Sequence, residues 1–299
     1  MKAKISLLIL LFTVVSFSFV NGQLVILSGP EQASYYRFIQ DINNVMGTSE
    51  RDACINQETS GAEYNFNQLI DPKSPYKVAM MQSDLLFFKQ ALDMRDNTEK
   101  TKDIKVILPM ANEEIHVVTK ATSGLKKLQD LDSSLVAIGT KDQGTYATAS
   151  LIKDRSKVYW SSRNIHFDQA LKDLAMDQID AFFIIGSAPI EKLDIDPSVL
   201  RTEPALVELD DFNGWAKYYD HDTIYTGDYK WLEKDVPTFS IKTVLIVNEA
   251  KLTDADRAEI TKLVNGIKNN FDVLKKVGHP KWKEIDFNDW SDSDWPMYK

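Results

Sequence analysis

Short apolar runs alternate with polar turns and amphipathic stretches along most of the chain, and the first unit shows the pattern. Residues 24–27 are apolar, and residues 28–34 are polar and contain Gly29 and Pro30. The run predicts a buried strand, and the helical spacing of the apolar residues after the turn predicts a helix that packs on a sheet, with Ser34 as its N-cap. The apolar positions of this helix are Phe38, Ile39, Ile42 and Val45.

The same order of strand, polar turn and helix recurs further along the chain. Such alternation predicts an α/β fold with a parallel sheet and right-handed crossovers. The polar turns would then gather at the carboxyl edge of the strands, where small ligands bind in open α/β sheets. The expected strand and helix ranges are 53–55 with 64–70, 78–81 with 85–92, 135–139 with 146–153, and 181–185 with 190–193.

Three apolar segments are candidates for longer strands. Residues 104–109 and 115–118 are apolar and are separated by the more polar residues 110–114. Residues 237–248 form the longest strand candidate of the chain. We expect these strands to pass between two domains, since 299 residues exceed one typical domain.

The C-terminal half contains further elements. Residues 158–160 are a short strand candidate, and residues 215–229 are aromatic and polar without a clear period, which is long for a plain connection. Thr253 is expected to cap a helix whose apolar stripe runs over residues 260–274 and which stops at Gly278.

Composition and charge narrow the class of protein. Apolar residues make up 43% of the chain, which is enough for a sizeable core. The formal net charge of −9 becomes −11 when Lys2 and Lys4 are removed with the N-terminal segment. A surface this acidic argues against nucleic acid and anionic lipid as main partners, although a local positive pocket for a small anion remains compatible with it.

Residues 1–22 have the features of a secretory signal peptide. A charged start is followed by an apolar stretch at residues 5–20, and cleavage is expected near Gly22. The alternative is an N-terminal membrane anchor, but the stretch is short for a spanning helix. The sequence therefore predicts an exported, periplasmic protein. Its only cysteine, Cys54, forms no internal disulfide and is expected to be buried and inert.

The motifs of common enzymes are missing from the sequence. It contains no phosphate-binding G-x-x-x-x-G-K-[ST], no G-x-S-x-G and no H-E-x-x-H. Asp220, His221 and Asp222 are the one tight metal-like cluster, but three adjacent residues cannot all face one ion. Glu113 and Glu114 are neighbouring carboxylates that point apart, so paired acid–base work is weakly supported. Polar turns without a catalytic constellation are typical of a protein that binds a small polar ligand without transforming it.

Several weak motifs, in a shared order, resemble one family across nearly the whole chain after Gly22. The mature chain is similar to the TAXI type of solute-binding protein, the soluble subunit of one class of tripartite ATP-independent periplasmic (TRAP) transporter. Pro30, Glu31 and Gln32 depart from the small residues usual there, which directs attention to an altered ligand preference. The matching segments are Ser28 to Tyr36, Thr59 to Asn65, Gln82 to Asp84, Asn112 to His116, Gly139 to Thr145, Asp180 to Gly186 and Tyr225 to Tyr229.

The resemblance implies a two-lobed, periplasmic-binding-protein-like (type II) α/β fold with hinge strands and a ligand cleft between the lobes. The first lobe would contain residues 23–111 plus 237–299, and the second residues 112–236. The ligand would be a small polar solute, carboxylate-bearing and glutamate-like, delivered to TRAP membrane subunits by a monomeric, non-enzymatic protein without cofactor. The expected ligand contacts are Ser28, Tyr36, Ser60, Gly61, Asn65, Gln82 and Ser83 from the first lobe, and Thr140, Thr145 and Gly186 from the second.

Two other functions remain open on the sequence. One is a ligand-sensing module that passes its occupancy to a membrane sensor protein. The other is an exported metal-dependent hydrolase on the same fold, for which Asp220, His221 and Asp222 would be the best residues.

Overall fold

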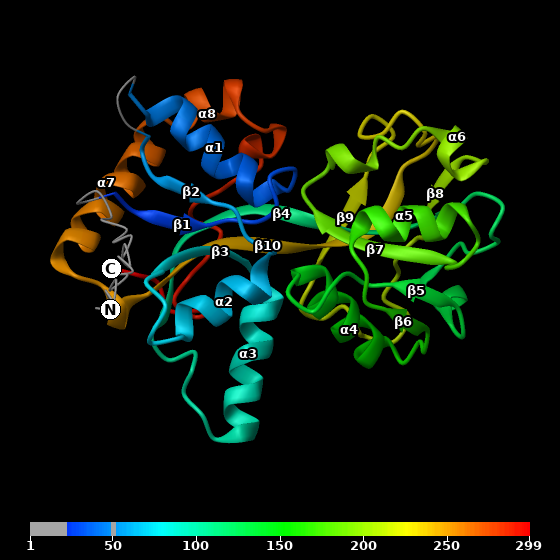
Figure 1. Ribbon diagram of the computed structural model, residues 1–299, viewed down its shortest axis with the longest axis horizontal. Coiled ribbons are helices and arrows are strands. Elements are labelled where there is room, and N and C mark those ends of the chain that lie inside the picture. The colour runs from blue at the N-terminus through cyan, green and yellow to red at the C-terminus, as the bar shows by residue number, and fades with distance from the viewer. Residues whose placement is uncertain (1–22, 49–51) are drawn as a thin grey trace, which may run out of the picture.

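The computed structural model describes residues 23–48 and 52–299, which form two lobes joined by one mixed β-sheet (Figure 1). The signal peptide predicted for residues 1–22 lies outside the described residues. Eight of the strands follow the order β2-β1-β3-β10-β4-β7-β5-β6, while β8 pairs with β4 and β9 with β10. The strands are β1 (Val25–Leu27), β2 (Ile55–Gln57), β3 (Val78–Gln82), β4 (Ile104–Lys120), β5 (Leu135–Ala137), β6 (Ser161–Arg163), β7 (Ala181–Gly186), β8 (Pro204–Leu206), β9 (Asp220–Ile224) and β10 (Val236–Asn248).

Helices cover both faces of the sheet in each lobe. In the first lobe, α1 and α8 lie on one side of the strands and α2 and α3 on the other (Figure 1). In the second lobe, α4 and α5 pack against β7. The α-helices are α1 (Ser34–Met46), α2 (Ala62–Ile70), α3 (Ser83–Asp96), α4 (Gly144–Ser156), α5 (Phe167–Ala175), α6 (Pro197–Leu200), α7 (Asp254–Asn269) and α8 (Phe271–Val277), and the 3-10 helices are η1 (Leu128–Leu131), η2 (Glu191–Leu193), η3 (Glu249–Lys251) and η4 (Pro280–Lys283).

Two long strands, β4 and β10, run through both lobes and connect them (Figure 1). They pair antiparallel from Asn248 opposite Ile104 to Ser240 opposite Glu114, with irregularities in register between Lys242 and Val244 and between Leu245 and Ile246. Residues 110–114, expected to separate two strands, are part of one continuous strand: residues 112–114 pair with β10, and the segment is mostly buried. β4 is therefore longer than β10, which the sequence favoured as the longest strand.

The sheet is mixed, whereas the alternation of strands and helices predicted a parallel sheet. The outer strands β2, β1 and β3 are parallel to one another, and so are β6, β5 and β7. The antiparallel contacts arise where β4 and β10 enter the sheet beside them. The prediction of parallel pairing holds for the strands of the strand–helix units. It fails for β4 and β10, since these two strands pair with partners that are distant in sequence.

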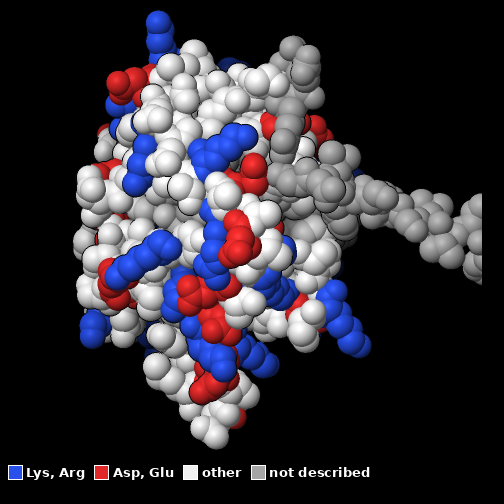
Figure 2. Space-filling view, turned by 90° about the vertical axis from the view of Figure 1, so that its left-hand side faces the viewer, with Lys and Arg blue, Asp and Glu red and all other residues white. Residues whose placement is uncertain are grey.

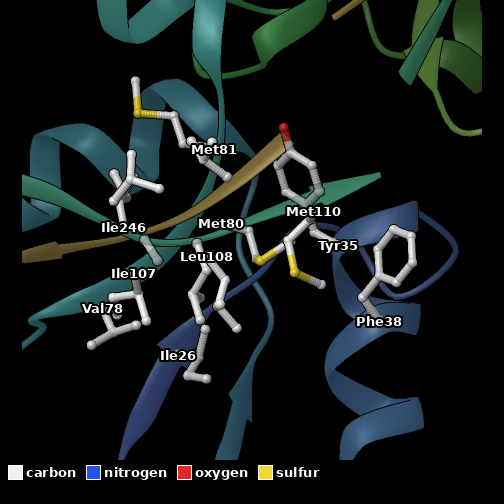
Figure 3. Packing of buried hydrophobic residues seen from close by; sticks show 14 of the residues in the cluster. Ile26, Tyr35, Phe38, Val78, Met80, Met81, Ile107, Leu108, Met110 and Ile246 are labelled. Atoms are coloured by element: carbon white, nitrogen blue, oxygen red, sulfur yellow. The ribbon is translucent and has the colours of Figure 1, made fainter. Parts of the chain in front are cut away.

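Three apolar cores stabilise the two lobes. One fills the first lobe between its sheet and helices, and Figure 3 shows part of it, with Ile26, Met80 and Ile246 from three strands around residues of α1. The other two lie in the second lobe. Along β10, Phe239 and Ile241 pack in a second-lobe core and Val244 in the first-lobe core, so the strand changes lobe between them.

Several predicted elements differ locally from those observed. Residues 158–160 precede strand β6 instead of forming a strand, because Trp160 is buried in the core and the pairing with β5 begins at Ser161. The C-terminal helix is interrupted at Asn270, which ends α7 and begins α8. Thr253 does cap α7, in a capping box with Asp256.

The C-terminal segment packs on the first lobe. Trp282 and Trp295 are buried in its core, and the chain pairs with β4 through a bridge between Met297 and Val106. The outer end of this lobe interleaves side chains of both signs (Figure 2). Within residues 23–48 and 52–299, no helix combines the length and the apolar character needed to cross a membrane.

Candidate ligand-binding site

A cavity of about 190 Å³ lies between the lobes at the ends of the strands. All five polar turns singled out in the sequence contribute to its wall, because the strands before them end at this edge of the sheet. The volume is below the roughly 300–1,000 Å³ of sites for drug-sized ligands, so the cavity suits a smaller molecule. The residues from these turns that line it are Gly29, Pro30, Gln32, Ala33, Ser34, Ser60, Gly61, Ala62, Gln82, Gln143, Gly144, Thr145, Gly186, Ser187 and Pro189.

Five of the ten expected ligand contacts line this cavity, and the other five do not. Ser60, Gly61 and Gln82 contribute from the first lobe, and Thr145 and Gly186 from the second. The remaining five residues hold the surrounding turns or lie beside the cavity. They are Ser28, Tyr36, Asn65, Ser83 and Thr140.

Asn65 is fully buried and ties strand ends together. Its Nδ2 donates to the carbonyl oxygens of Ser28 at 2.7 Å and Met80 at 2.9 Å, and its Oδ1 accepts from Thr59 Oγ1 at 2.8 Å. Ser28 is equally buried and donates through Oγ to the carbonyl of Gln57. These side chains fix the ends of β1 and β3, and so position the turns that line the cavity.

Thr140 and Tyr36 are displaced from the cavity by local geometry. The backbone N–H of Thr140 donates to Gln143 Oε1 at 2.8 Å inside the turn, which passes Gly139 at a φ of +79°, in the left-handed region that favours glycine. Tyr36 lies one residue further round α1 than Tyr35, and Tyr35 lines the cavity in its place. Ser83 is the first residue of α3 and is buried.

Three helices begin at the cavity with no side chain capping them. The first turns of α1, α2 and α4 contribute Ser34, Ala62 and Gly144 to the wall, and each helix lacks a side-chain cap hydrogen bond. Ser34, expected as an N-cap, is the first helical residue, and its Oγ accepts from the backbone of Ser187 at 3.0 Å instead. The positive end of the helix dipole favours an anionic group at such termini.

Glu113 and Tyr35 form the buried polar centre of the wall. Glu113 lies on β4 with 4% of its surface exposed, and Tyr35 Oη donates to its Oε2 at 3.0 Å. Burial raises the pKa of Glu113 to about 7, although the hydrogen bond from Tyr35 and the nearby hydroxyls of Thr243 and Ser34 favour the charged form. The sequence showed the neighbouring acids Glu113 and Glu114, but nothing in it indicated that one of them faces a cavity.

The carboxylate of the next residue on β4, Glu114, accepts hydrogen bonds from both lobes. Its Oε1 accepts from Lys281 Nζ of the first lobe, and its Oε2 accepts from the backbone of Ala188 of the second lobe at 2.7 Å. Burial raises the pKa of Glu114 to about 7, while Lys281 opposes that rise. Burial acts against the charge of Lys281, but the attraction and hydrogen bonds of Glu114 and Glu284 together outweigh it and leave the pKa of that ammonium raised.

The lobes contact each other directly around the cavity. The backbone of Tyr64 donates to the carbonyl of Asp142 at 3.2 Å, and Arg37 pairs with Glu191 at 2.7 Å. Deeper in the seam, Asp84 Oδ2 accepts from Thr148 Oγ1 at 2.8 Å and Tyr219 Oη at 3.3 Å. The arrangement is therefore a closed one.

Gly144 and Gln82 mark the tightest point between the lobes. A β-carbon at Gly144 would lie 1.5 Å from Gln82 Oε1 and 2.6 Å from its Cδ, so any larger residue there displaces the Gln82 amide. Gln82 Oε1 is buried and has no hydrogen-bond partner in the described structure. Glycine at position 144 thus leaves room for the observed position of the Gln82 amide.

The residues of the metal-site alternative lie away from the cavity. Asp220, His221 and Asp222 are successive residues of β9, so their side chains alternate between its faces, and the His221 ring packs on Phe239 at 4.7 Å between centroids. Across the described residues, no group of three or more His, Cys, Asp or Glu side chains is placed to hold a metal ion.

Comparison with solved structures identifies the class of fold. MatC (Rpa3494) from Rhodopseudomonas palustris with bound malate matches with a TM-score of 0.54 and 12% identity, over 87% of this chain and 88% of that chain. The fold is therefore the two-lobed α/β fold of periplasmic binding proteins of type II, as predicted. Residues 26–293 match the NMT1-like family, and the chain belongs to that family.

Two further structures are similar at lower scores. One is an amino acid ABC transporter substrate-binding protein from Streptococcus pneumoniae bound to L-arginine, with 13% identity over 88% of this chain and 93% of that chain and a TM-score of 0.48. The other is a binding protein component of an ABC phosphonate transporter (PA3383) from Pseudomonas aeruginosa, with 10% identity over 81% and 74% and a TM-score of 0.48.

Proposed function

We propose that this protein captures a small polar solute between its lobes outside the cytoplasm and delivers it to the membrane subunits of a TRAP transporter. The observation that carries the proposal is the cavity, whose wall comes from polar turns of both lobes and is closed by direct contacts between them. A site of this kind couples ligand binding to hinge closure, which a membrane partner can recognise. The division into residues 23–111 plus 237–299 and residues 112–236 is part of this proposal.

The ligand carries a carboxylate or a similar anionic group in this proposal, and a glutamate-like solute would satisfy it. The uncapped first turns of α1, α2 and α4 at the cavity favour such a group. We propose Ser60, Gly61, Gln82, Thr145 and Gly186 as ligand contacts. Ser28, Tyr36, Asn65, Ser83 and Thr140 would support these contacts from behind.

The assignment to a TRAP transporter rests on the resemblance to the TAXI type, and the NMT1-like family and the fold are compatible with it. The same resemblance and the apolar N-terminus support export to the periplasm with cleavage near Gly22. A TRAP membrane subunit encoded beside this gene would support the transport role. A membrane sensor encoded there, with no transporter, would instead favour the sensing module.

A thermal-shift screen tests the binding function. The mature chain, from Gln23, is heated with single amino acids, small mono- and dicarboxylic acids and small amines. A ligand at 100 times its Kd stabilises the folded state by about 2.7 kcal/mol, which corresponds to a rise in Tm of roughly 5–10 °C for a chain of this size. A screen in which no small solute raises Tm would refute the proposed function.

A further inference from the structure

Glu113 is a buried carboxyl group at the cavity that lacks a cationic partner in the protein. It lines the cavity with 4% of its surface exposed. Its polar neighbours are hydroxyl groups: Tyr35 Oη donates at 3.0 Å, and the hydroxyls of Thr243 and Ser34 lie nearby. No Lys, Arg or His in the described part of the chain forms an ion pair with Glu113, although buried carboxylates are usually paired.

The cations nearest the site are already paired. Lys281 binds Glu114 and Glu284, and Arg37 at the mouth binds Glu191. Lys192 lies 3.6 Å from Asp168. His279 also lines the cavity, but burial lowers the pKa of its imidazole, which favours the neutral form.

The acceptor groups at the cavity therefore outnumber the charged donors that face them. Besides Glu113, the buried Oε1 of Gln82 has no hydrogen-bond partner among the described residues. An anionic ligand group beside Glu113 would be repelled, whereas a protonated nitrogen would form a charge-assisted hydrogen bond in a site with little water.

We infer that Glu113 is a specificity-determining residue that selects ligands bearing a protonated nitrogen, which its carboxylate binds. This inference rests on the proposed solute-binding function and adds the chemical class of the ligand. Together with the uncapped helix starts, it makes the cavity complementary to a small zwitterion. Dicarboxylic acids that lack nitrogen are then poor ligands.

If Glu113 were protonated in the complex, it would bind a ligand oxygen instead of an ammonium, and the pH dependence of affinity would be reversed. A carboxyl group with a pKa of about 7 could remain protonated and donate to a ligand oxygen. Affinity would then fall as the pH rises from 6 to 8, whereas an ammonium held by the carboxylate binds more tightly over that range. The titratable groups around Glu113 are Tyr35 on α1, Glu114 on β4, Asp84 on α3 and His279 before η4, and the nearest cation, Lys281, pairs with Glu114.

Isothermal titration with matched ligand pairs tests the inference on the mature chain. L-glutamate and 2-oxoglutarate share their carbon skeleton and both carboxylates, and L-alanine and pyruvate form a second pair. We expect the wild type to bind an amino acid at least tenfold more tightly than the matching oxo acid. E113Q should lose this preference. E233Q removes one exposed carboxylate that does not line the cavity, and should retain it.

The outcomes separate this inference from the function on which it rests. If an oxo acid binds the wild type as tightly as its amino acid, or if affinity falls from pH 6 to pH 8, the inference is overturned and the solute-binding function stands. If no probe from the wider screen of acids, amino acids and amines binds, the proposed function fails as well. If E113Q does not fold, E113D is the test variant. It should bind more weakly than the wild type and still prefer the amino acid over the oxo acid, and loss of that preference contradicts the inference.

Discussion

Replacing Lys281 with methionine should destabilise the protein strongly, because it leaves a buried carboxylate without its cation. The side chains of Glu114 and Lys281 are 1% and 10% exposed. Removing one partner of such a pair costs about 3–5 kcal/mol, since the remaining charge is buried and uncompensated. At roughly 2–4 °C per kcal/mol for a protein of this size, Tm should fall by about 6–20 °C.

The pH dependence and two further variants identify the cause. Glu114 has a raised pKa of about 7 in the folded protein, so it is protonated well below that pH and needs no cation there. The deficit of K281M should therefore be largest at pH 8 and shrink at pH 5, and E114Q/K281M should recover most of the loss at pH 8. K283M, which removes an exposed lysine from the same 3-10 helix, is the control. Urea unfolding measures each variant, and a K281M deficit below about 1 kcal/mol at pH 8 would refute this reasoning.

Three further predictions concern pH, helix capping and the mouth of the cavity. Burial raises the pKa of Glu113 from 4.5 to about 7 in the folded protein, so Glu113 contributes about 3 kcal/mol to the free energy of unfolding below pH 4.5, and this contribution is lost as the pH rises through 7. Urea unfolding of E113Q should lack this loss between pH 5 and pH 8.5, and a pH profile identical to that of the wild type would contradict the prediction. T253A removes the cap of α7 and should lower the free energy of unfolding by about 1 kcal/mol, with an unchanged urea midpoint as the contrary result. R37A breaks a pair that is 49% and 65% exposed, so calorimetry with the best solute of the screen should show less than a threefold change in affinity; a tenfold loss would mean that Arg37 contacts the ligand.

The sequence predicts the order of elements well because each strand–turn–helix unit is local. It identified all five turns that line the cavity, since polar residues after a buried strand are visible as a pattern. It did not predict the mixed sheet, because the pairing of β4 with β10 joins residues that are more than 120 positions apart. Which side of a turn faces a cavity likewise depends on these distant contacts.

Individual site residues show the same limit. Tyr35 and Tyr36 are equivalent in the sequence, and only the packing of α1 decides that Tyr35 faces the cavity. Asn65 was expected to bind ligand, but its amide is used entirely in holding strand ends. Glu113 was missed because its burial results from the meeting of two lobes, which no local pattern encodes.

Blocking closure of the lobes tests the central claim most directly. In G144V the added side chain collides with Gln82 across the seam, while the backbone at this position lies outside the left-handed region and accepts valine. The control is G227V, because a β-carbon there meets nothing within 4 Å and its backbone is also compatible with valine. We expect calorimetric titration with the best solute of the screen to show one site per chain in wild type and G227V, and at least tenfold weaker binding in G144V, a difference of about 1.4 kcal/mol or more. Equal affinity in a folded G144V would contradict the claim that the solute is held between the closed lobes.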